Sequence, residues 1–555
     1  YTLADDPETF GGYFDSGSTW TTNSLTETRK DDYHVTSQVI ANYMGTFGSH
    51  DLTVMAGFEN YYMKDEELTA ARDKYELTGY PYLNIGSEDF QTNSGKGSEY
   101  TSNSVFGRVI YSYADRYLFQ ANIRHDGSSR FAKGYRWGTF PSFSAGWVMS
   151  EEKFMKSLNW DWLSFLKLRG SWGILGNERI GDDYFPYIAL MSFGNSLFYM
   201  ADGSVVSDKT ARPAILAVED ITWETTTSTD FGLDANFFNN RLQFHFDYYW
   251  KQTKDMLLKI EIPYFMGYNN PNTNAGKMST HGYDIELAWN DRIGDLQYGV
   301  NVNFSDFLSK IDYMNDGEQI SNGKIKRAGV LFNEYYGYVC DGIYQTQEEV
   351  NNSARTSTTV TVGDLKYRDI SGPDGVPDGI ISPEYDRVPL GNSLPRFQYG
   401  GTFNASYKGI DFSIAFQGIG KQNSYLSTAM VQPLRDNYGS VPSIIEGKYW
   451  SPFNTAEENL SARYPRLSNV SKSNNYATSN FWMFNGSYFR LKNLTLGYTL
   501  PETWTQKAGI DRVRFYISGS DLFCLSNFPD GWDPEMGASS YPITTSLVMG
   551  LQVNF

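Results

Sequence analysis

Four aspartates fall within a short stretch rich in proline and glycine. Asp369, Asp374, Asp378 and Asp386 lie in the run D-I-S-G-P-D-G-V-P-D-G-I-I-S-P-E-Y-D, where glycines permit sharp bends and Ile380 supplies an apolar anchor. Carboxylate oxygens are the ligands that Ca²⁺ and Mg²⁺ prefer. The composition is that of calcium loops written D-x-D-x-D-G-x-I, although insertions change the spacing. We therefore expect a bound Ca²⁺ or Mg²⁺ here, and the alternative is an acidic turn without an ion.

Aromatic side chains gather in segments that read as long loops. Flat apolar sugar faces stack on such rings, and peptide side chains pack against them. The candidate substrate contacts that we single out are Tyr335, Tyr336, Trp450 and Trp482. The wider set of loop aromatics also includes Tyr80, Tyr82, Phe198, Tyr199, Tyr449 and Phe481. For each ring taken alone, packing of one loop on another is the simpler explanation.

Residue types suited to catalysis are present, but their pattern does not predict an enzyme. The run R-H-D-G-S-S-R-F at residues 124–131 holds a histidine, an aspartate and serines, yet its D-G pair is ordinary turn chemistry. Nucleophilic catalysis needs a base held by a third group, and none can be placed here. The other histidines are scattered without metal-ligand spacing. Cys340 and Cys524 are expected to be isolated thiols, the alternative being one pair across neighbouring loops.

The last dozen residues show which kind of element must carry these groups. Leu547, Met549, Leu551, Val553 and Phe555 are apolar at every second position, with mostly small or polar residues between them. Only a strand has that period. An alternating strand that ends on an aromatic residue is typical of the closing strand of an outer-membrane β-barrel. A buried edge strand of a soluble sandwich has the same pattern, and this segment alone does not separate the two.

Composition favours the barrel. A chain of 555 residues would normally form several soluble domains, but no domain boundary is visible. Aromatic residues make up 16% of the chain although its mean hydropathy is −0.46, which suits a wall with aromatic girdles and a polar lumen. No run of apolar residues is long enough for a membrane-spanning helix. The net charge of −18 argues against nucleic acid as a partner.

The chain reads as repeated hairpins of about sixteen strands, each about 10 to 15 residues long. The expected strands are residues 18–30, 33–46, 51–64, 102–114, 116–126, 139–149, 163–174, 222–238, 241–254, 278–290, 295–310, 397–407, 410–422, 487–499, 512–522 and 544–555. Short turns fall on one side, where residues 150–161 form a helical link. The long connections 65–101, 175–221, 311–396 and 423–486 fall on the other. We expect short periplasmic turns and extracellular loops that carry the partner surface.

Residues 122–181 carry a family resemblance. I-R-H-D-G-S-S-R-F, R-W-G-T-F-P-S-F-S-A-G-W and L-K-L-R-G-S-W-G, followed by G-N and I-G, resemble the SusC/RagA-like TonB-dependent transporters of Bacteroidetes outer membranes. The likeness continues through F-F-N-N-R-L-Q-F-H-F-D-Y-Y, G-D-L-K-Y-R-D and L-K-N-L-T-L-G-Y-T-L, so it covers essentially the whole chain. It implies a transmembrane antiparallel β-barrel of 22 strands around an amino-terminal plug, with a SusD-like surface lipoprotein as a lid.

On this resemblance, residues 1–555 are one partial barrel domain. Some six strands, the plug and the TonB box would then precede Tyr1, which itself reads as part of a loop. The resemblance implies import of a bulky glycan or peptide through an outer-membrane barrel, energised by TonB through the plug. It also allows a dimer of transporter–lipoprotein pairs. Two other readings compete: a passive sixteen-strand porin, which the strand count permits, and an outer-membrane enzyme, for which the sequence offers no catalytic constellation.

Overall fold

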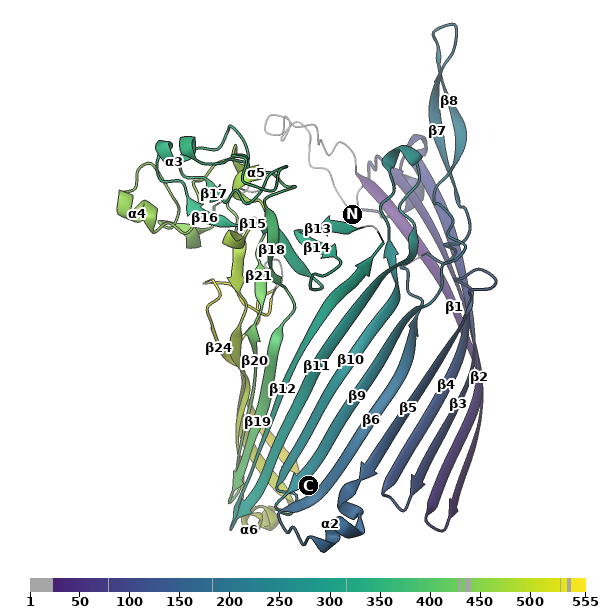
Figure 1. The fold of residues 1–555 in the computed structure, drawn as a ribbon, viewed down its shortest axis with the longest axis vertical. Coiled ribbons are helices and arrows are strands. Elements are labelled where there is room, and N and C mark those ends of the chain that lie inside the picture. Colours follow the sequence, from purple (N-terminus) through teal and green to yellow (C-terminus); the bar gives the residue numbers. More distant parts are fainter. Residues whose placement is uncertain are drawn as a thin grey trace.

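Fifteen antiparallel strands form one curved, tilted wall (Figure 1). The computed structural model describes residues 23–555 except 78, 182, 316, 428–430, 435–440, 530 and 537–540. In spatial order the strands are β1 (Ser24–Phe47), β2 (His50–Asp73), β3 (Gln91–Tyr113), β4 (Tyr117–Ser128), β5 (Trp137–Val148), β6 (Leu163–Asn177), β9 (Glu224–Phe237), β10 (Leu242–Lys259), β11 (Asn272–Ile293), β12 (Leu296–Met314), β19 (Arg396–Tyr407), β20 (Ile410–Lys421), β23 (Tyr488–Thr499), β24 (Arg512–Ser526) and β25 (Ser546–Asn554). The expected all-β architecture is confirmed.

The remaining elements lie in the connections. They are the strands β7 (Met191–Tyr199), β8 (Val205–Pro213), β13 (Glu318–Ser321), β14 (Lys324–Arg327), β15 (Glu334–Tyr338), β16 (Cys340–Ile343), β17 (Leu365–Tyr367), β18 (Arg387–Asn392), β21 (Asn423–Tyr425) and β22 (Met483–Asn485). The α-helices are α2 (Lys153–Ser157), α3 (Gln347–Asn352), α4 (Ala456–Leu460), α5 (Lys472–Asn475) and α6 (Glu502–Thr505). The 3₁₀ turns are η1 (Leu83–Ile85), η2 (Glu88–Phe90), η3 (Met149–Glu151), η4 (Tyr264–Met266), η5 (Ser443–Ile445), η6 (Asn480–Trp482) and η7 (Gln506–Ala508). Among the described residues, no helix has the length and apolarity needed to span a membrane.

Side chains alternate between an apolar and a polar face of the wall. On β9, Phe231 points to the outer face with 57% of its surface exposed. Its neighbours Asp230 and Asp234 point to the opposite face, where both form ion pairs with Arg169 of β6. Because successive residues of a strand face opposite sides, one set meets lipid and the other lines a polar lumen. The wall therefore has the two faces that a membrane barrel requires.

The two ends of the wall differ, as the sequence predicts. The turn between β1 and β2 is only Gly48 and Ser49, and Gly48 takes a φ of 64° that a tight turn needs. Turns of this kind, together with α2 and α6, lie at the bottom of Figure 1, and the long connections lie at the top. The helical link at residues 150–161 is confirmed by α2.

The count of sixteen strands is corrected to fifteen in this sheet. Residues 18–22 of the first expected strand lie outside the described residues. The rest of the expected strands 18–30 and 33–46 forms one strand, β1, and much of the expected loop 65–101 belongs to β2 and β3. These strands stay paired through charge-rich sequence, in register from His50 opposite Tyr113 to Arg72 opposite Gln91. Charged cross-strand neighbours such as Lys30 and Glu67, 3.0 Å apart, offset one another there. The polar sequence of these residues predicts a loop. They form strands nevertheless, because backbone hydrogen bonds continue wherever a neighbouring strand is present to pair with.

The described sheet has two unpaired edge strands, β1 and β25. Strand β1 enters the short turn at Gly48, and β25 follows a long connection from β24, so both run from the long-loop end to the short-turn end. Two strands with the same direction cannot pair antiparallel. A closed antiparallel barrel therefore needs an odd number of further strands. For the expected total of 22 strands that number is seven, instead of the six that sixteen strands in this chain would leave.

A charge on the outer face should destabilise the wall. We expect Phe231→Arg to lower the free energy of unfolding by about 2–4 kcal/mol, because the guanidinium would lie in the hydrocarbon layer. The measurement is denaturant unfolding of the full-length protein in lipid bilayers. The matched control is Ser171→Arg, since Ser171 lies on the polar face opposite Asp230. Equal losses for the two variants would contradict the assignment of the faces.

Candidate functional site

Two long connections fold together into a compact body above one part of the wall, at the upper left of Figure 1. We call residues 315–395 and 423–486 the loop module. Its apolar core draws on both connections and on a third that follows β24. The buried members of that core are Tyr338, Leu365, Tyr367, Ile381, Leu426, Val431, Trp482 and Phe528. The long loops on this part of the rim are therefore packed against one another.

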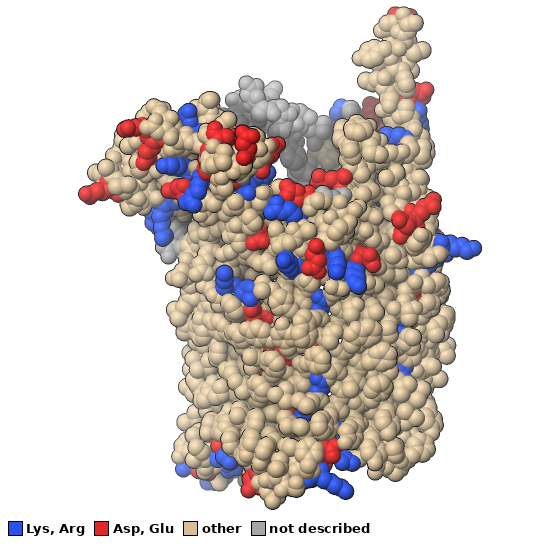
Figure 2. All heavy atoms as spheres, viewed as in Figure 1, with Lys and Arg blue, Asp and Glu red and all other residues tan. Residues whose placement is uncertain are grey.

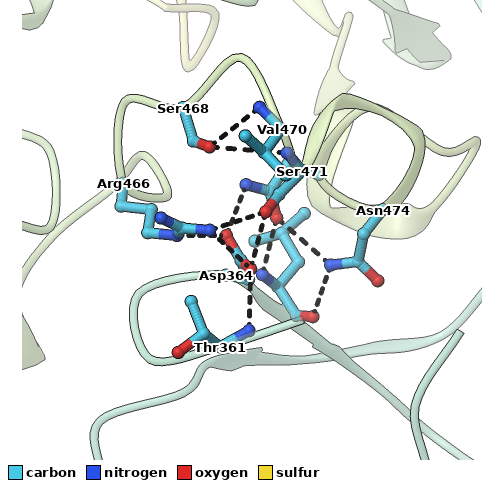
Figure 3. Close-up of polar contacts among 9 residues, drawn as sticks. Thr361, Asp364, Arg466, Ser468, Val470, Ser471 and Asn474 are labelled. Carbon is cyan, nitrogen blue, oxygen red and sulfur yellow. Dashed lines mark hydrogen bonds and ion pairs between the residues drawn. The ribbon is translucent and has the colours of Figure 1, made fainter. Parts of the chain in front are cut away.

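A buried ion pair joins the two connections of the loop module (Figure 3). The carboxylate of Asp364 is fully buried and accepts a hydrogen bond of 2.7 Å from Nε of Arg466. It also accepts hydrogen bonds from the hydroxyl of Ser471, at 2.9 Å, and from the side-chain amide of Asn475, at 3.0 Å. The backbone N–H of Thr361 supplies a further donor at 2.9 Å. Because a buried charge is tolerated only when it is paired and hydrogen-bonded, this carboxylate requires both connections in place.

Two adjacent asparagines extend the contact between the connections. Oδ1 of Asn475 accepts from the backbone N–H of Leu365 at 2.9 Å, and Nδ2 of Asn474 donates to the carbonyl of Leu365 at 3.0 Å. The backbone carbonyls of the same asparagines accept from the indole of Trp482 and the hydroxyl of Tyr367, at 2.7 and 2.6 Å. Burial raises the pKa of the Tyr367 hydroxyl well above its usual value, so this hydroxyl stays a donor.

The four aromatic residues singled out from the sequence are all buried in the structure. Trp482 lies in the core of the loop module, and Tyr336 packs with apolar residues beside the end of β12. The indole of Trp450 donates to the side-chain carbonyl of Gln345 at 3.2 Å, and Tyr335 is covered as well. Burial supports loop packing for these rings, and their contact with substrate stays a prediction. Of the wider set, Tyr80, Tyr82, Phe198 and Tyr199 are exposed.

The acidic stretch is arranged around Asp386. Its buried carboxylate accepts the backbone N–H groups of Ile370 and Ser382, each at 2.7 Å, and of Ser371 at 3.3 Å. Asp369 and Asp378 accept one backbone N–H each, from Gly379 and Ile380, and Asp374 is exposed. Within the described part of the chain, no three His, Cys, Asp or Glu side chains are gathered as a metal site would need. The contacts explain why Asp386 is required for the turn, and the cation stays a prediction.

The two cysteines are free thiols, as expected from the sequence. Cys340 lies in the loop module, whereas Cys524 lies on β24. Burial raises the pKa of the Cys340 thiol to about 11. Such a thiol is almost entirely protonated at neutral pH and is a poor nucleophile.

Ion pairs follow the polar face of the wall from strand to strand. Arg169 of β6 lies 2.5 Å from the carboxylate of Asp247 on β10 and 3.2 Å from that of Asp234 on β9. Asp306 of β12 binds the guanidinium of Arg396 on β19. These groups carry charge along a surface that faces the lumen, where water or a polar protein segment can solvate it. Figure 2 shows the opposite kind of surface, a broad band of the outer wall with few charges.

A cluster of tyrosines and one arginine lies near the long-loop end of the polar face. The guanidinium of Arg130 lies 4.4 Å from the ring centre of Tyr184 and 5.4 Å from that of Tyr100. Tyr100 also packs on Tyr61, with ring centres 5.9 Å apart, and donates its hydroxyl to Glu178. Beside Tyr184, β1, β2 and β3 border a hollow of about 600 Å³ lined by carboxylates and lysines. This surface offers rings, cations and anions to a bulky polar solute.

Sequence reasoning missed both the tyrosine–arginine cluster and the buried ion pair. The cluster combines residues from β2, from β3, from the turn after β4 and from the connection between β6 and β9. Asp364 and Arg466 are 102 positions apart. These residues are too far apart in the sequence for a short motif to indicate that they meet. The one local signal was Arg130, in the run R-H-D-G-S-S-R-F, and structural anchoring of a loop is what the sequence predicts for that run.

Comparison with known proteins identifies related chains. A model of the family described as TonB dependent receptor-like, beta-barrel matches residues 1–518. TonB-dependent receptor P3 of Formosa agariphila is 29% identical over 94% of this chain and 52% of its own length. TonB-dependent receptor SusC of Bacteroides thetaiotaomicron is 28% identical over 94% of this chain and 50% of its own length. The chain thus spans about half the length of these relatives.

Solved structures agree on the fold. The structure of the RagAB peptide transporter superposes with a TM-score of 0.78 at 23% identity, covering 96% of this chain and 57% of that one. The RagAB peptide importer in its open-open state gives a TM-score of 0.77, also at 23% identity, with 96% and 56% covered. At this identity the superposition shows a common fold.

Removing the buried carboxylate should separate the two connections of the loop module. We expect Asp364→Ala to raise the hydrogen-exchange rate of the Leu365 amide roughly a hundredfold, since its loss leaves the partly buried Arg466 and the side chains of Ser471 and Asn475 without their shared acceptor, at a cost of about 3 kcal/mol. The control is Asp341→Ala, because Asp341 forms an exposed ion pair with Arg368, and such pairs contribute little to stability. Similar exchange in both variants would show that the buried pair does not join the connections.

The acidic turn allows a second test in the same experiment. Asp386→Ala leaves three backbone N–H groups without their acceptor, so we expect faster exchange at residues 370, 371 and 382 and a local cost of roughly 2–4 kcal/mol. Asp374→Ala, at an exposed position, should change little. Adding Ca²⁺ or Mg²⁺ to the unaltered protein tests the cation. Increased protection of this loop would support it, and identical exchange in chelator would contradict it.

Proposed function

Because this chain belongs to the TonB-dependent receptor-like β-barrel family, we propose that it forms the wall of an importer that takes up a bulky nutrient, a glycan or a peptide. The chain is an outer-membrane β-barrel protein. The observation that carries the proposal is the family match along residues 1–518, because it extends over the wall as far as β24 and over most of the loops. No bond is made or broken in this function.

The geometry of the wall supports transport of a polar solute. Ion pairs such as Arg169–Asp247 line the inner face, while residues such as Phe231 face lipid. A solute large enough to require such a barrel would be a glycan or a peptide. One structural neighbour, RagAB, is a peptide transporter, which supports a peptide as cargo. A glycan is the alternative that the family resemblance implies.

Coupling of uptake to an energy source would require parts of the full-length protein other than this wall. We propose that a plug domain occupies the lumen in the full-length protein and carries the contact with TonB. The charged inner face supports this, because a polar plug can be packed against it with its charges paired. A SusD-like surface lipoprotein would close the long-loop end, and two such transporter–lipoprotein pairs could assemble as a dimer in the membrane.

A passive porin and an enzyme are the two competing functions. Membership in a family of TonB-dependent receptors argues against the passive porin. For an enzyme, the nearest grouping of suitable side chains is around residues 124–131, where Arg124 and Asp126 pair with one another at 2.7 Å. His125 shares a hydrogen bond of 2.8 Å with Thr139 on the neighbouring strand and stacks on Trp137. These contacts join residues within the wall, and none of them activates a nucleophile.

Uptake should stop when the proton-motive force is collapsed. We expect a protonophore, or deletion of TonB, to abolish uptake of the cognate solute into cells that carry the full-length protein, because a plugged lumen does not conduct a bulky molecule. Neutral oligosaccharides are tested first and oligopeptides second, with radiolabelled cargo. Cells lacking the transporter provide the background. Equal uptake with and without the protonophore would overturn active transport and favour a passive pore.

A further inference from the structure

The outer face of strands β10 and β11 changes from apolar to basic toward the long-loop end. This face is fixed by the register, because Tyr248 lies opposite Phe231 on one side and Tyr283 on the other. Along β10 its side chains are Leu242, Phe244, Phe246, Tyr248 and Trp250, followed by Gln252 and Lys254. Along β11 they are Trp289, Leu287, Ile285, Tyr283 and His281, followed by Ser279 and Lys277. The apolar series therefore ends near Trp250 and His281.

The length of this apolar series fits the thickness of a membrane. A strand that rises about 3.3 Å per residue at a tilt of about 40° climbs roughly 20 Å between Trp289 and His281. The apolar band of an outer-membrane barrel is about 25 Å tall and is flanked by aromatic girdles. Figure 2 shows the upper border of this band, where charged side chains gather. Residues just beyond Trp250 and His281 therefore lie at the level of the headgroups of the outer leaflet.

Three lysines occupy that level on neighbouring strands. Lys310 of β12 lies opposite Ser279 of β11. Lys277 of β11 lies opposite Tyr313, whose surface is 53% exposed. On its other side Lys277 borders Lys254 of β10, at a bulge in the pairing of β10 with β11. Lys277 is therefore the direct or diagonal neighbour of both other lysines, and such neighbours have Cβ atoms about 5–8 Å apart.

These three lysines, Lys254, Lys277 and Lys310, have no counter-ion within the described part of the chain. Two carboxylates are close in sequence, and neither pairs with them: Asp312 accepts a hydrogen bond of 2.9 Å from the hydroxyl of Ser279, and Asp255 lies within the bulge. Like charges on adjacent strands repel one another. The surface is therefore basic at the border of the membrane, although the whole chain carries a net charge of −18.

The position of the lysines indicates which anion they bind. They continue the face that contacts lipid, so a lipid whose headgroup carries a phosphate can place its acyl chains on the apolar band and its phosphate among the ammonium groups. Lysine binds phosphate as a point charge. Trp250 and Tyr313 present aromatic rings at the same level, on which sugar units of a headgroup can stack. A phosphorylated glycolipid of the outer leaflet combines these features.

We propose that Lys254, Lys277 and Lys310 form a binding site for the phosphate of a glycolipid in the outer leaflet of the membrane. The site spans β10, β11 and β12 where a bulge interrupts the pairing of β10 with β11. A bound headgroup offsets the repulsion between the lysines and joins the three strands at that point. The inference rests on the outer-membrane location of the wall and does not depend on import.

The experiment uses the full-length protein in nanodiscs of phosphatidylcholine to which lipid A, a phosphorylated glycolipid, is added in increasing amounts. The test variant carries Lys254→Gln, Lys277→Gln and Lys310→Gln. Native mass spectrometry counts the lipid A molecules that each barrel retains. We expect the affinity for lipid A to fall roughly a hundredfold in the test variant, about fivefold for each lysine near an anionic group. Unchanged affinity would overturn the proposal.

Two control variants separate the charge of this site from other effects. The first removes the same charge from exposed lysines at the short-turn end, through Lys153→Gln, Lys408→Gln and Lys507→Gln. We expect it to bind lipid A as the unaltered protein does. The second keeps the charge of the site, through Lys254→Arg, Lys277→Arg and Lys310→Arg, and should retain most of the binding. A loss in either control as large as that of the test variant would contradict the assignment.

Two competitors identify which part of the lipid is recognised. Lipid A stripped of its phosphates has the same acyl chains, and inorganic phosphate has the charge without the chains. We expect the unaltered protein to retain neither at the concentration at which it retains lipid A. Equal retention of the dephosphorylated lipid would overturn phosphate recognition. Displacement of lipid A by an equal concentration of inorganic phosphate would overturn the lipid and indicate a site for free anions.

A crosslink identifies the occupant in intact cells. Photoreactive benzoylphenylalanine replaces Tyr313, which is exposed beside Lys277, and the product is analysed by mass spectrometry. We expect a product with a phosphorylated glycolipid. A product with a second copy of this chain, or with another protein, overturns the proposal.

Discussion

The pairing of backbone N–H and C=O groups within a membrane governs the rest of this structure. Hydrocarbon offers these groups no water, so each strand of the wall must hydrogen-bond to a neighbour on both sides. Thirteen of the fifteen described strands do so in a single antiparallel sheet, and its two edge strands, β1 and β25, run in the same direction. The alternation of lipid-facing and lumen-facing side chains follows from the same pleated ladder. Charge can therefore occupy the inner face without entering the membrane.

Outside the membrane, water can hydrogen-bond to backbone groups, so the connections need not form a continuous sheet. They are stabilised in different ways. The loop module builds its own core and joins its two halves through Asp364 and Arg466, a pair whose carboxylate is fully buried. A buried charge of this kind tolerates no alternative arrangement, because losing either partner leaves the other without compensation. The module is thus a defined part of the rim, and its aromatic rings stabilise it from within.

The β7–β8 hairpin has the opposite character. It has one paired ladder, no apolar core and a face of exposed large side chains. The tyrosine–arginine cluster around Arg130 lies near the same end of the wall.

The sequence alone determined the class of fold and the position of most strands, because strand alternation is a local property. Residues 397–407 and 410–422 were expected as strands and coincide almost fully with β19 and β20. Motif resemblance also indicated the family. The tertiary structure decided what depends on distant partners. Residues 65–73 continue β2 because β1 and β3 flank them, and Asp364 is buried because Arg466, 102 positions away, reaches it. Local periodicity contains no information about such pairings, since they depend on which segments meet after the chain has folded.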